Sequence, residues 1–500
     1  MIFVSLLGAS HHSWSEIFYK PYLNAVLRSA SQIGCVAGLS LLLGLPCGLL
    51  IGYARFYGKL IACFLLAFPL LLPPFLWAIG IQSLKPLVRY RWQQYFDGAC
   101  GAVLAYTVFV MPLVAFSTGL IAARIGQSAR DATLLCGGIP RLVKYTLWFV
   151  FPGAVAMACT GALLTLGDSG VGQIMGFHGA PSEVLIAFSA RGDLATAMLK
   201  AVTTSVLFSP LIIVVAWTLL RNFDLAPSPR GMAAPVRQMN TSFSHISVSV
   251  GLFGLAAILL APALIGLGRP LFVGIPPWRE FASALMLWWD SSLVTLTYWA
   301  LAGICATTLG SVLAAAALDE YRMRQVIFFF CLLCLTIPSA IPALAAVWLR
   351  THANVGISPV LGSDSFSAAV IGLHFVPISV AILLPAFRSL PRRLWEAAEI
   401  QGISIWRYGL RVQLPMVSGA VLTSVVVVGL LALADVSTAS LLQQPGHSTF
   451  GGHLFAVMDN SSEKNVAALC AVYAILPTAI LGGWILTIGL RNSFQRTNPS

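Results

Sequence analysis

Charged side chains are scarce in this sequence. Only 29 Lys and Arg and 17 Asp and Glu occur among 500 residues, or 9% of the chain, whereas a soluble globular protein carries roughly 25%. Hydrophobic residues make up 58%, and the mean hydropathy is +0.87. These values exclude a soluble domain, a disordered chain and a coiled coil. The net charge of +12 is spread thinly between apolar runs, so no nucleic-acid partner is expected.

A phosphate-binding loop is also lacking. Such a loop requires the pattern G-x-x-x-x-G-K, but the only Gly-Lys dipeptide is Gly58-Lys59, and Tyr53 stands where the first Gly would be. The apolar runs contain no paired carboxylates and no His and carboxylate cluster that an intramembrane enzyme would need. We therefore expect no catalytic residues, no bound cofactor and no enzymatic activity in this chain.

The ten cysteines do not form a disulfide framework or a metal site. Cys331 and Cys334 have the spacing of a redox or metal pair, but they lie inside an apolar run with no second pair nearby. Packing is the preferred interpretation for them, and no metal ligands are expected. Most of the others also lie in apolar runs, where free Cys behaves as a small hydrophobic residue: Cys35, Cys47, Cys63, Cys159, Cys305 and Cys470.

Long apolar stretches free of ionised side chains are what the sequence has in abundance. A helix needs about 20 apolar residues to cross the bilayer core, and lipid leaves helices as the only option for such runs. Another stretch, Val436 to Met458, contains several polar residues and is predicted to be a loop outside the lipid. Eleven stretches qualify as spans: Ser29–Ala54, Leu60–Leu84, Gly98–Ala123, Tyr145–Gly167, Ala201–Leu220, Ile246–Gly268, Ser291–Leu318, Gln325–Leu349, Ser365–Phe387, Val412–Ala434 and Asn465–Leu490.

The distribution of Lys and Arg predicts the orientation of these spans. If the loop around Arg392 is cytoplasmic, that side carries 18 of the 29 basic residues and the other side carries 11. The exception is the cluster Lys85, Arg89 and Arg91, which this topology places outside. A bacterial inner-membrane location with several passes is therefore expected.

Two halves of the chain repeat each other. A Pro-rich polar linker, residues 223–246, separates a first half, 1–222, from a second half, 247–491. The first half has five spans and the second has six, so the first half starts past its expected opening helix; either the N-terminus lies outside the membrane or the true start is upstream. At a shift of 263 to 269 residues, Pro69, Pro73, Gly137, Pro152 and Asp168 align with Pro338, Pro342, Gly402, Pro415 and Asp435.

The cytoplasmic loop 388–411 carries the most specific pattern. Pro391 suits the start of a helix, good helix formers follow, and Gly402 ends it. Ala397 and Ala398 would let another surface approach the helix backbone closely, while Glu396 offers a polar anchor. These are the properties of a short docking helix.

This pattern resembles the cytoplasmic loop of the transmembrane subunits of binding-protein-dependent ATP-binding-cassette importers. The family pattern is E-A-A, three residues, G, nine residues, I-x-L-P, with Val412 here in place of Ile. The matching residues are Glu396, Ala397, Ala398, Gly402, Leu414 and Pro415. The first half has a degenerate copy in the loop 131–144, with Asp131, Ala132 and Gly137 in place and Pro152 two residues late.

The resemblance implies an all-α membrane protein of two tandem permease repeats, similar to a type I importer. In that family the loop helix docks in a groove on a separate ATPase subunit, which binds ATP and Mg²⁺ and is expected in two copies. A periplasmic binding protein delivers the substrate. A fused pair of halves resembles the ferric iron and thiamine permeases, and Leu433 to Gly446 is similar to the iron type, with Gln444 replacing the first Pro of a Pro-Pro-Gly turn. Iron is the expected substrate; thiamine, polyamine and phosphonate are alternatives.

Two further sets of residues are candidates for function. Pro69, Pro73, Pro338 and Pro342 lie at matching places in both halves, where they would loosen helices beside a shared pathway or serve only in packing. Asp168 and Asp435 follow spans at the outer face, where they would contact a binding protein or be solvated helix ends. An ion-coupled secondary transporter is the alternative of a different class, but His374 is the only ionisable residue inside the eleven spans.

Overall fold

A computed structural model describes residues 19–53, 58–123, 125–224, 242–272, 278–318, 321–352, 358–444, 446–458 and 460–497. Within these ranges the chain is helical, and its only extended pairing is an isolated bridge between Gln444 and His447. The predicted all-α membrane fold is confirmed. The proposed opening of the first half at residues 1–18 and most of the linker, residues 225–241, lie outside the described residues.

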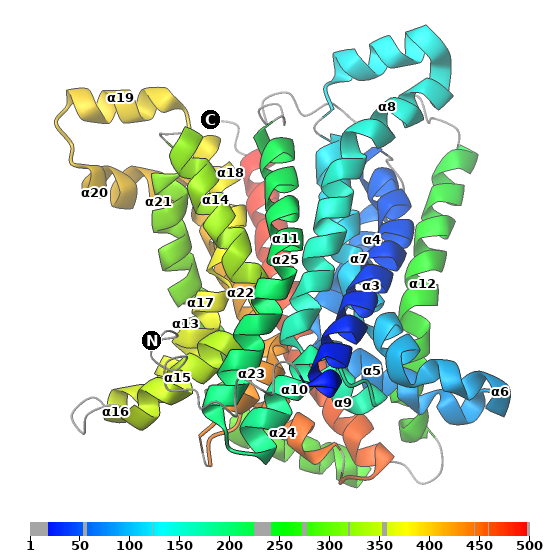
Figure 1. The fold of residues 1–500 in the computed structure, drawn as a ribbon. Helices are drawn as coiled ribbons and strands as arrows, with labels where there is room; N and C mark the ends of the chain where they lie inside the picture. The colour runs from blue at the N-terminus through cyan, green and yellow to red at the C-terminus, as the bar shows by residue number, and fades with distance from the viewer. Residues whose placement is uncertain are drawn as a thin grey trace. The chain divides into compact units, whose positions relative to one another are not determined.

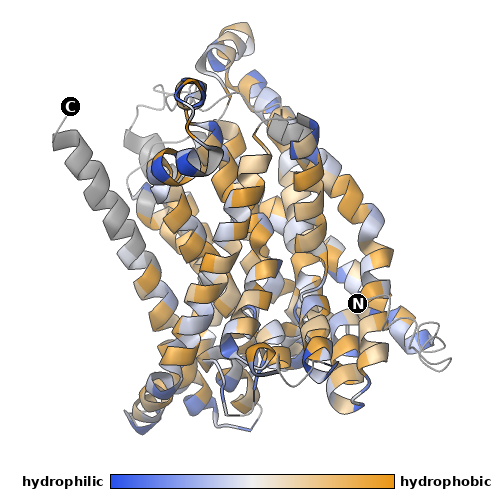
Figure 2. Ribbon diagram, turned by 90° about the vertical axis from the view of Figure 1, so that its left-hand side faces the viewer, coloured by the Kyte–Doolittle hydropathy of each residue, from blue (hydrophilic) through white to orange (hydrophobic). Residues whose placement is uncertain are grey.

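Seven long helices are apolar enough to cross a membrane, and four bent pairs of helices could each form one further span. The described residues thus contain up to eleven spans, as predicted. Hydrophobic residues run along the middle of the long helices, and hydrophilic residues gather near their ends (Figure 2). The seven helices are α3 (Lys20–Tyr53), α7 (Gly98–Ala123), α8 (Gln127–Leu164), α11 (Leu194–Asp224), α12 (Ser242–Phe272), α13 (Trp278–Ala316) and α25 (Glu463–Thr497). The bent pairs are α4 (Lys59–Leu71) with α5 (Pro74–Ser83), α14 (Tyr321–Thr336) with α15 (Ala340–His352), α17 (Asp364–His374) with α18 (Val376–Arg388), and η6 and α21 (Gly409–Met416) with α22 (Ser418–Ala434).

Two of these bends occur at the repeated prolines. The chain turns by 95° between α4 and α5, beside Pro69 and Pro73, and by 79° between α14 and α15, beside Pro338. Pro73 has no N–H, so it cannot donate to the carbonyl of Pro69 as a continuous helix would require. The indole N–H of Trp77 donates to that carbonyl instead, at 3.3 Å, which makes the bend tolerable inside a buried region.

The chain forms two compact units, and their boundary differs from that of the sequence halves. The first unit comprises Met1–Gly274 and Thr336–Ala345. Helix α12, which the sequence repeat places at the start of the second half, packs on α4 and α5 of this unit. The approach is close: a Cβ at Gly80 would lie 2.4 Å from the carbonyl oxygen of Ala263. The small residues Gly80 and Ala263 allow this close packing, so α12 belongs to the first unit although it follows the linker in the sequence.

Helices α3 and α7 form the centre of the first unit. Gly44, Gly48 and Gly52 of α3 face α7, and a Cβ at Gly48 would lie 2.4 Å from the carbonyl oxygen of Ala115. Small residues four apart on one helix face thus let the two backbones approach closely. Cys47 and Met111 extend this contact as part of a buried apolar cluster.

The second unit comprises Ile275–Leu335 and Ala346–Ser500, with α13 packed against α17, α18 and α22. Gly303 of α13 faces Val425, and Gly372 of α17 faces Ala302, again without room for a Cβ. The buried hydroxyls of Thr307 and Ser424 bond to each other at 2.9 Å. Unit 2 therefore uses close small-residue contacts of the same kind as unit 1.

In each unit, the same order of helices follows the repeated Asp. In the first unit, Asp168 precedes α9 (Gly170–Met175), α10 (Ala180–Leu185) and the long helix α11; in the second, Asp435 precedes α23 (Val436–Leu442), α24 (Phe450–Val457) and α25. The stretch Val436 to Met458 was predicted to be a loop, and that prediction was wrong, because its apolar residues form two short helices packed on their own unit. Within each unit these short helices lie at one end (Figure 1).

Candidate functional site

The loop 388–411 contains the predicted short helix, α19 (Arg392–Ile400), directly after Pro391. The helix ends in a Schellman motif: the N–H of Ile403 donates to the carbonyl of Ala398 at 2.9 Å, and the N–H of Gly402 donates to the carbonyl of Glu399 at 3.0 Å. Gly402 has φ +67°, a left-handed conformation that glycine adopts without steric cost. The chain reversal after α19 therefore depends on Gly402.

Helix α19 presents its motif residues to the outside. Glu396 and Ala397 are exposed, Ala398 is buried, and the side chain of Ile400 is 86% exposed. Trp395 packs edge-on against Tyr408 of α20 (Ile405–Tyr408), with ring centroids 5.0 Å apart. This contact fixes one face of α19 against its own loop and leaves the opposite face uncovered.

The degenerate copy in the first half has a related form. The first segment of α8 ends at a kink, where Gly138 has φ +65° and Gly137 is in an extended conformation. The guanidinium of Arg141 donates to the carbonyl of Cys136 at 2.9 Å and so caps this segment. Asp131, Ala132 and Gly137 are all exposed. The long helix α8 therefore consists of two helical segments, one before and one after the kink.

A shift of 265 residues superimposes the exposure pattern of the two segments. Asp131, Ala132 and Gly137 correspond to Glu396, Ala397 and Gly402, and all six are exposed. Leu135, 88% exposed, corresponds to Ile400. Sequence reasoning missed this aliphatic pair, although each member lies one helical turn after the acidic residue. A single exposed aliphatic side chain is ordinary, but two at equivalent positions indicate a repeated contact surface.

The segments differ in how they are anchored. The counterpart of Trp395 is Arg130, which is 1% exposed and whose guanidinium donates to the carbonyl of Ala122 at the end of α7, at 2.9 Å. Each segment is thus held by the residue directly before its acidic residue, once through an aromatic contact within its own loop and once through a hydrogen bond to the preceding helix.

The last two motif residues, Leu414 and Pro415, lie at the junction between the loop and a span. They belong to α21 (Leu414–Met416), after which the chain bends by 74° into α22. Val417, at the bend, is buried in an apolar cluster with Ala314 of α13 and Leu383 of α18. A displacement of the loop would reach three spans of the second unit through this junction.

The Pro338 turn and the neighbourhood of Asp168 are brought together in the first unit. The hydroxyl of Ser339 donates to the carbonyl of Gly167 at 3.4 Å, and Ile341 and Leu344 pack on α10 and α11. Asp168 accepts a hydrogen bond from the N–H of Gly170 at 2.8 Å and lines a small cavity with Gln32 and Tyr106.

Asp435 likewise bonds to the turn that follows it. Its carboxylate accepts from the N–H and the hydroxyl of Thr438, at 3.1 and 2.6 Å, and caps helix α23. Both Asp168 and Asp435 are only partly exposed. The two repeated acidic residues therefore organise the first turn after a span in both units.

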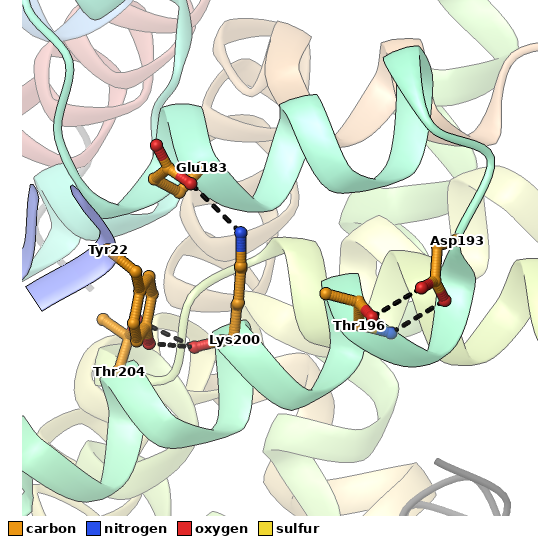
Figure 3. Close-up of polar contacts among 6 residues, drawn as sticks. All are labelled: Tyr22, Glu183, Asp193, Thr196, Lys200 and Thr204. Atoms are coloured by element: carbon orange, nitrogen blue, oxygen red, sulfur yellow. Dashed lines mark hydrogen bonds and ion pairs between the residues drawn. The ribbon is translucent and has the colours of Figure 1, made fainter. Parts of the chain in front are cut away.

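Sequence reasoning also missed a charged residue inside a candidate membrane helix and its partner on a neighbouring short helix. The fifth span was predicted to begin at Ala201, directly after a charged residue, but α11 begins at Leu194 and includes Lys200. Lys200 is buried, and its ammonium lies 3.0 Å from the carboxylate of Glu183 on α10. Figure 3 shows these two side chains pointing toward each other, whereas Asp193 and Thr196 meet at the first turn of α11.

The basic cluster Lys85, Arg89 and Arg91 is the exception to the expected charge distribution, and local contacts explain part of it. Lys85 forms an ion pair with Asp97, so its charge is compensated at the same end of the unit. Arg89 and Arg91 are exposed and alternate with the exposed aromatic residues Tyr90 and Trp92. Aromatic and basic side chains together are typical of membrane interfaces.

Residues 306–492 match the family described as "Binding-protein-dependent transport system inner membrane component". The match supports an ABC importer permease component. It covers α19, Gly402 and Pro415, and it does not extend to the first half of the chain. Searches of curated proteins and of solved structures found no match. This permease family is an inner-membrane component that works with a binding protein and an ATPase and is not itself catalytic.

Proposed function

We propose that this chain is a two-half permease of an ATP-driven importer, in which α19 and the segment before Gly137 each dock on one ATPase subunit at the cytoplasmic face. The observation that carries the proposal is the repeated surface: an exposed acidic residue, an exposed Ala, an exposed aliphatic side chain and a terminal Gly recur at a shift of 265 residues. Two docking segments would accommodate two ATPase copies, which bind ATP and Mg²⁺.

The aliphatic residues Leu135 and Ile400 supply most of the affinity in this proposal. Burying such a side chain fully is worth about 1.5 to 3 kcal/mol, and both are almost fully exposed in the chain alone. Glu396 and Asp131 would add orientation, because an acidic side chain at the rim pairs with a cationic or N–H group of the partner. The small residues Ala132 and Ala397 allow the partner to approach the helix backbone.

Work would pass from the docking segments to the spans through rigid junctions. In the second unit, three contacts restrict motion between α19 and α22. They are the Schellman motif at the end of α19, the packing of Trp395 on Tyr408, and the burial of Val417. In the first unit, α8 continues past its kink directly into the membrane. ATP-driven closure of the partner pair would then move the spans between inward-open and outward-open states.

The bends at Pro69, Pro73, Pro338 and Pro342 are our candidates for the pathway and its gate. Support comes from their matching positions in the two halves and from the 95° and 79° turns, which place irregular backbone in buried surroundings. In membrane proteins such backbone is tolerated where it is packed in protein or lines a cavity. Asp168 and Asp435 are our candidates for contact with the binding protein, because they directly precede α9 and α23, which lie at the opposite end of each unit from its docking segment (Figure 1).

Ferric iron is the substrate we propose to test first. This proposal rests on the similarity of Leu433 to Gly446 to iron-type permeases and on the fused halves, and not on a ligand set, since the described residues contain no group of three His, Cys, Asp or Glu that could hold a metal ion. Uptake of radiolabelled ferric iron, with thiamine, a polyamine and a phosphonate as competitors, decides among the alternatives.

Charge substitutions on the docking segments test the proposal. Ile400→Asp and Leu135→Asp should each weaken binding of the purified ATPase by about 30-fold, the effect of losing ~2 kcal/mol at a central contact. Ile139→Asp is the matched control, because Ile139 is 71% exposed beside the first segment but corresponds to Ser404 in the second. Equal binding by all three variants would contradict docking at these residues.

The energy source separates this proposal from a secondary transporter. The purified chain should hydrolyse no ATP until the ATPase subunit is added, and reconstituted uptake should require ATP. Uptake driven by a proton or sodium gradient in the absence of the ATPase would establish the ion-coupled alternative instead.

A further inference from the structure

The ion pair between Lys200 and Glu183 joins α11 to α10 in the first unit. The side chain of Lys200 is 4% exposed and that of Glu183 is 21% exposed, and their charged atoms are 3.0 Å apart. An ionisable residue within a membrane helix is costly and is generally retained for function. A buried ion pair is also weak evidence for stability, since an apolar pair often stabilises as well.

Several side chains hold Lys200 in this position. The ring of Tyr22 on α3 lies 5.7 Å from the ammonium, close enough for a cation–π attraction. The hydroxyl of Tyr22 donates to the backbone carbonyl of Lys200 at 2.8 Å and lies 3.0 Å from the hydroxyl of Thr204 (Figure 3). The ammonium is thereby directed from α11 toward α10, and α3 supports it from the side.

Helix α10 needs such an attachment because it is short. It spans only Ala180–Leu185 before a wide turn, Ile186–Ala190, and a helix of this length has little stability of its own. Its N-terminus is held by the hydroxyl of Ser29, which accepts from the N–H of Ala180 at 2.9 Å. The Glu183 carboxylate provides the attachment in the middle of the helix.

The Pro338 turn packs on the same pair of helices. Ile341 and Leu344 contact an apolar cluster that includes Val184 of α10 and Met198 of α11. Glu183 and Val184 are neighbours on α10, so the ion pair and the apolar contact act on the same turn of helix. Any displacement of α10 away from α11 would remove part of the surface on which the Pro338 turn rests.

We propose that the ion pair of Glu183 and Lys200, here called the catch, positions α10 against the Pro338 turn. We further propose that this ion pair breaks when the Pro338 turn moves during transport. Both are positioning residues, since neither needs to touch the substrate. The proposal rests on the proposed gate role of the prolines. A charged pair suits a catch because it is strong when closed, and each ion can be hydrated when the pair opens to the aqueous side.

The test follows the exposure of Ser339, which is buried in the closed arrangement. A Ser339→Cys variant of the full chain, reconstituted with its ATPase and binding protein, is treated with a membrane-impermeant maleimide. Modification of Cys at this position is measured on its own peptide by mass spectrometry, so the ten native cysteines do not interfere. Lys200→Met and Glu183→Gln in this background should raise the labelling rate about tenfold, as expected for loss of a largely buried ion pair.

Two further variants keep the proposal testable. The exchange Glu183→Lys with Lys200→Glu should return labelling to within about threefold of the parent, because it restores opposite charges at the same two positions. Asp193→Asn is the matched control, since Asp193 is on the same helix but bonds only within its first turn, and Asn is an equally good cap.

The outcomes separate the catch from the proposed function. Single variants that label at the parent rate, or an exchange variant that labels as fast as the single ones, would overturn the catch. If the parent itself shows no change in labelling on addition of ATP, the proposed gate fails, whatever the variants do. If a single variant does not reach the membrane, recovery by the exchange variant still supports the pair, and lack of recovery counts against it.

Discussion

The two units hold their short helices by different means, although the order of elements is the same. In the first unit, α10 is attached to α11 through the ion pair of Glu183 and Lys200. In the second, α24 is attached to α25 through stacked rings of Phe450 and Tyr473, whose centroids are 6.1 Å apart. The hydroxyl of Tyr473 also donates to the carbonyl of Leu433 at 2.9 Å. An ion pair can open by hydration, whereas stacked rings lose their contact only by exposing apolar area, so the first unit has the more easily switched attachment.

The two docking segments have similar exposed residues, but different residues hold them in place. Exposed positions coincide at a shift of 265 residues, while Arg130 supports one segment and Trp395 the other. The exposed residues of the two segments correspond, whereas the residues that face the chain's own interior differ. In our proposal, the first segment therefore offers a partner the same features as the second.

The largest expected effect comes from replacing the positive-φ glycine at the end of each docking segment. Gly402→Val places a β-branched residue at φ +67°, a conformation that costs at least about 1 to 2 kcal/mol, and it should abolish ATPase binding and uptake while the protein remains in the membrane. Gly138→Val should disrupt the end of the first segment at least as strongly, because φ +65° with ψ −162° is a conformation essentially restricted to glycine. Binding of labelled ATPase to reconstituted protein measures both.

Gly409→Ala is the control for these variants. Gly409 lies in the same loop, has no positive φ, and a Cβ there would meet no atom within 4 Å. Ala at this position should leave ATPase binding unchanged. Equal losses in Gly402→Val and Gly409→Ala would show that the loop tolerates no substitution and that the Schellman end has no special role.

A second prediction concerns the stacked attachment. Phe450→Ala should lower the free energy of unfolding by about 3 kcal/mol, the usual cost of this truncation in a packed core, since Phe450 is 1% exposed. Phe450→Leu retains most of the volume and should lose much less. Thermal unfolding of the purified chain measures both, and a loss for Phe450→Ala that disappears at high salt would contradict an apolar attachment.

The smallest expected effect comes from removing the N-terminal caps of α11 and α25. Asp193 caps α11 by accepting from Thr196, and Ser462 caps α25 by accepting from the N–H of Asn465. Burial alone would raise the pKa of Asp193, but the hydrogen bonds from Thr196 outweigh it and hold the pKa below its usual value. Because the folded-state pKa is lowered, the stabilisation is complete above the unfolded-state pKa of about 3.9 and is lost as pH falls through the folded-state value.

Asp193→Ala should therefore cost about 1 kcal/mol at neutral pH, and the difference from the parent should shrink below about pH 4. Ser462→Ala should cost a similar amount at every pH, since a hydroxyl does not titrate. Chemical unfolding at several pH values checks this pair. A pH-independent loss for Asp193→Ala would refute the ionised cap.

Local patterns predicted much of the fold. Runs without charge indicated up to eleven spans, and Pro391 and Gly402 bounded α19 correctly because helix start and stop signals act within a few residues. The prediction of a loop at Val436 to Met458 failed since a count of polar residues misses short helices packed on their own unit. The span boundary at Ala201 failed because a charge was taken to end a helix, although Glu183 compensates Lys200 inside it.

The sequence by itself determined that this chain is helical and lies in a membrane and that a short helix near Glu396 begins after Pro391 and ends at Gly402, and it predicted two related halves. These properties depend on hydropathy and on signals between near neighbours. Only the tertiary structure decided that α12 and the Pro338 turn belong to the first unit, that Leu135 and Ile400 share one exposed position, and that Lys200 meets Glu183. These features depend on which side chains fit together across distant parts of the chain, and packing of that kind leaves no local pattern.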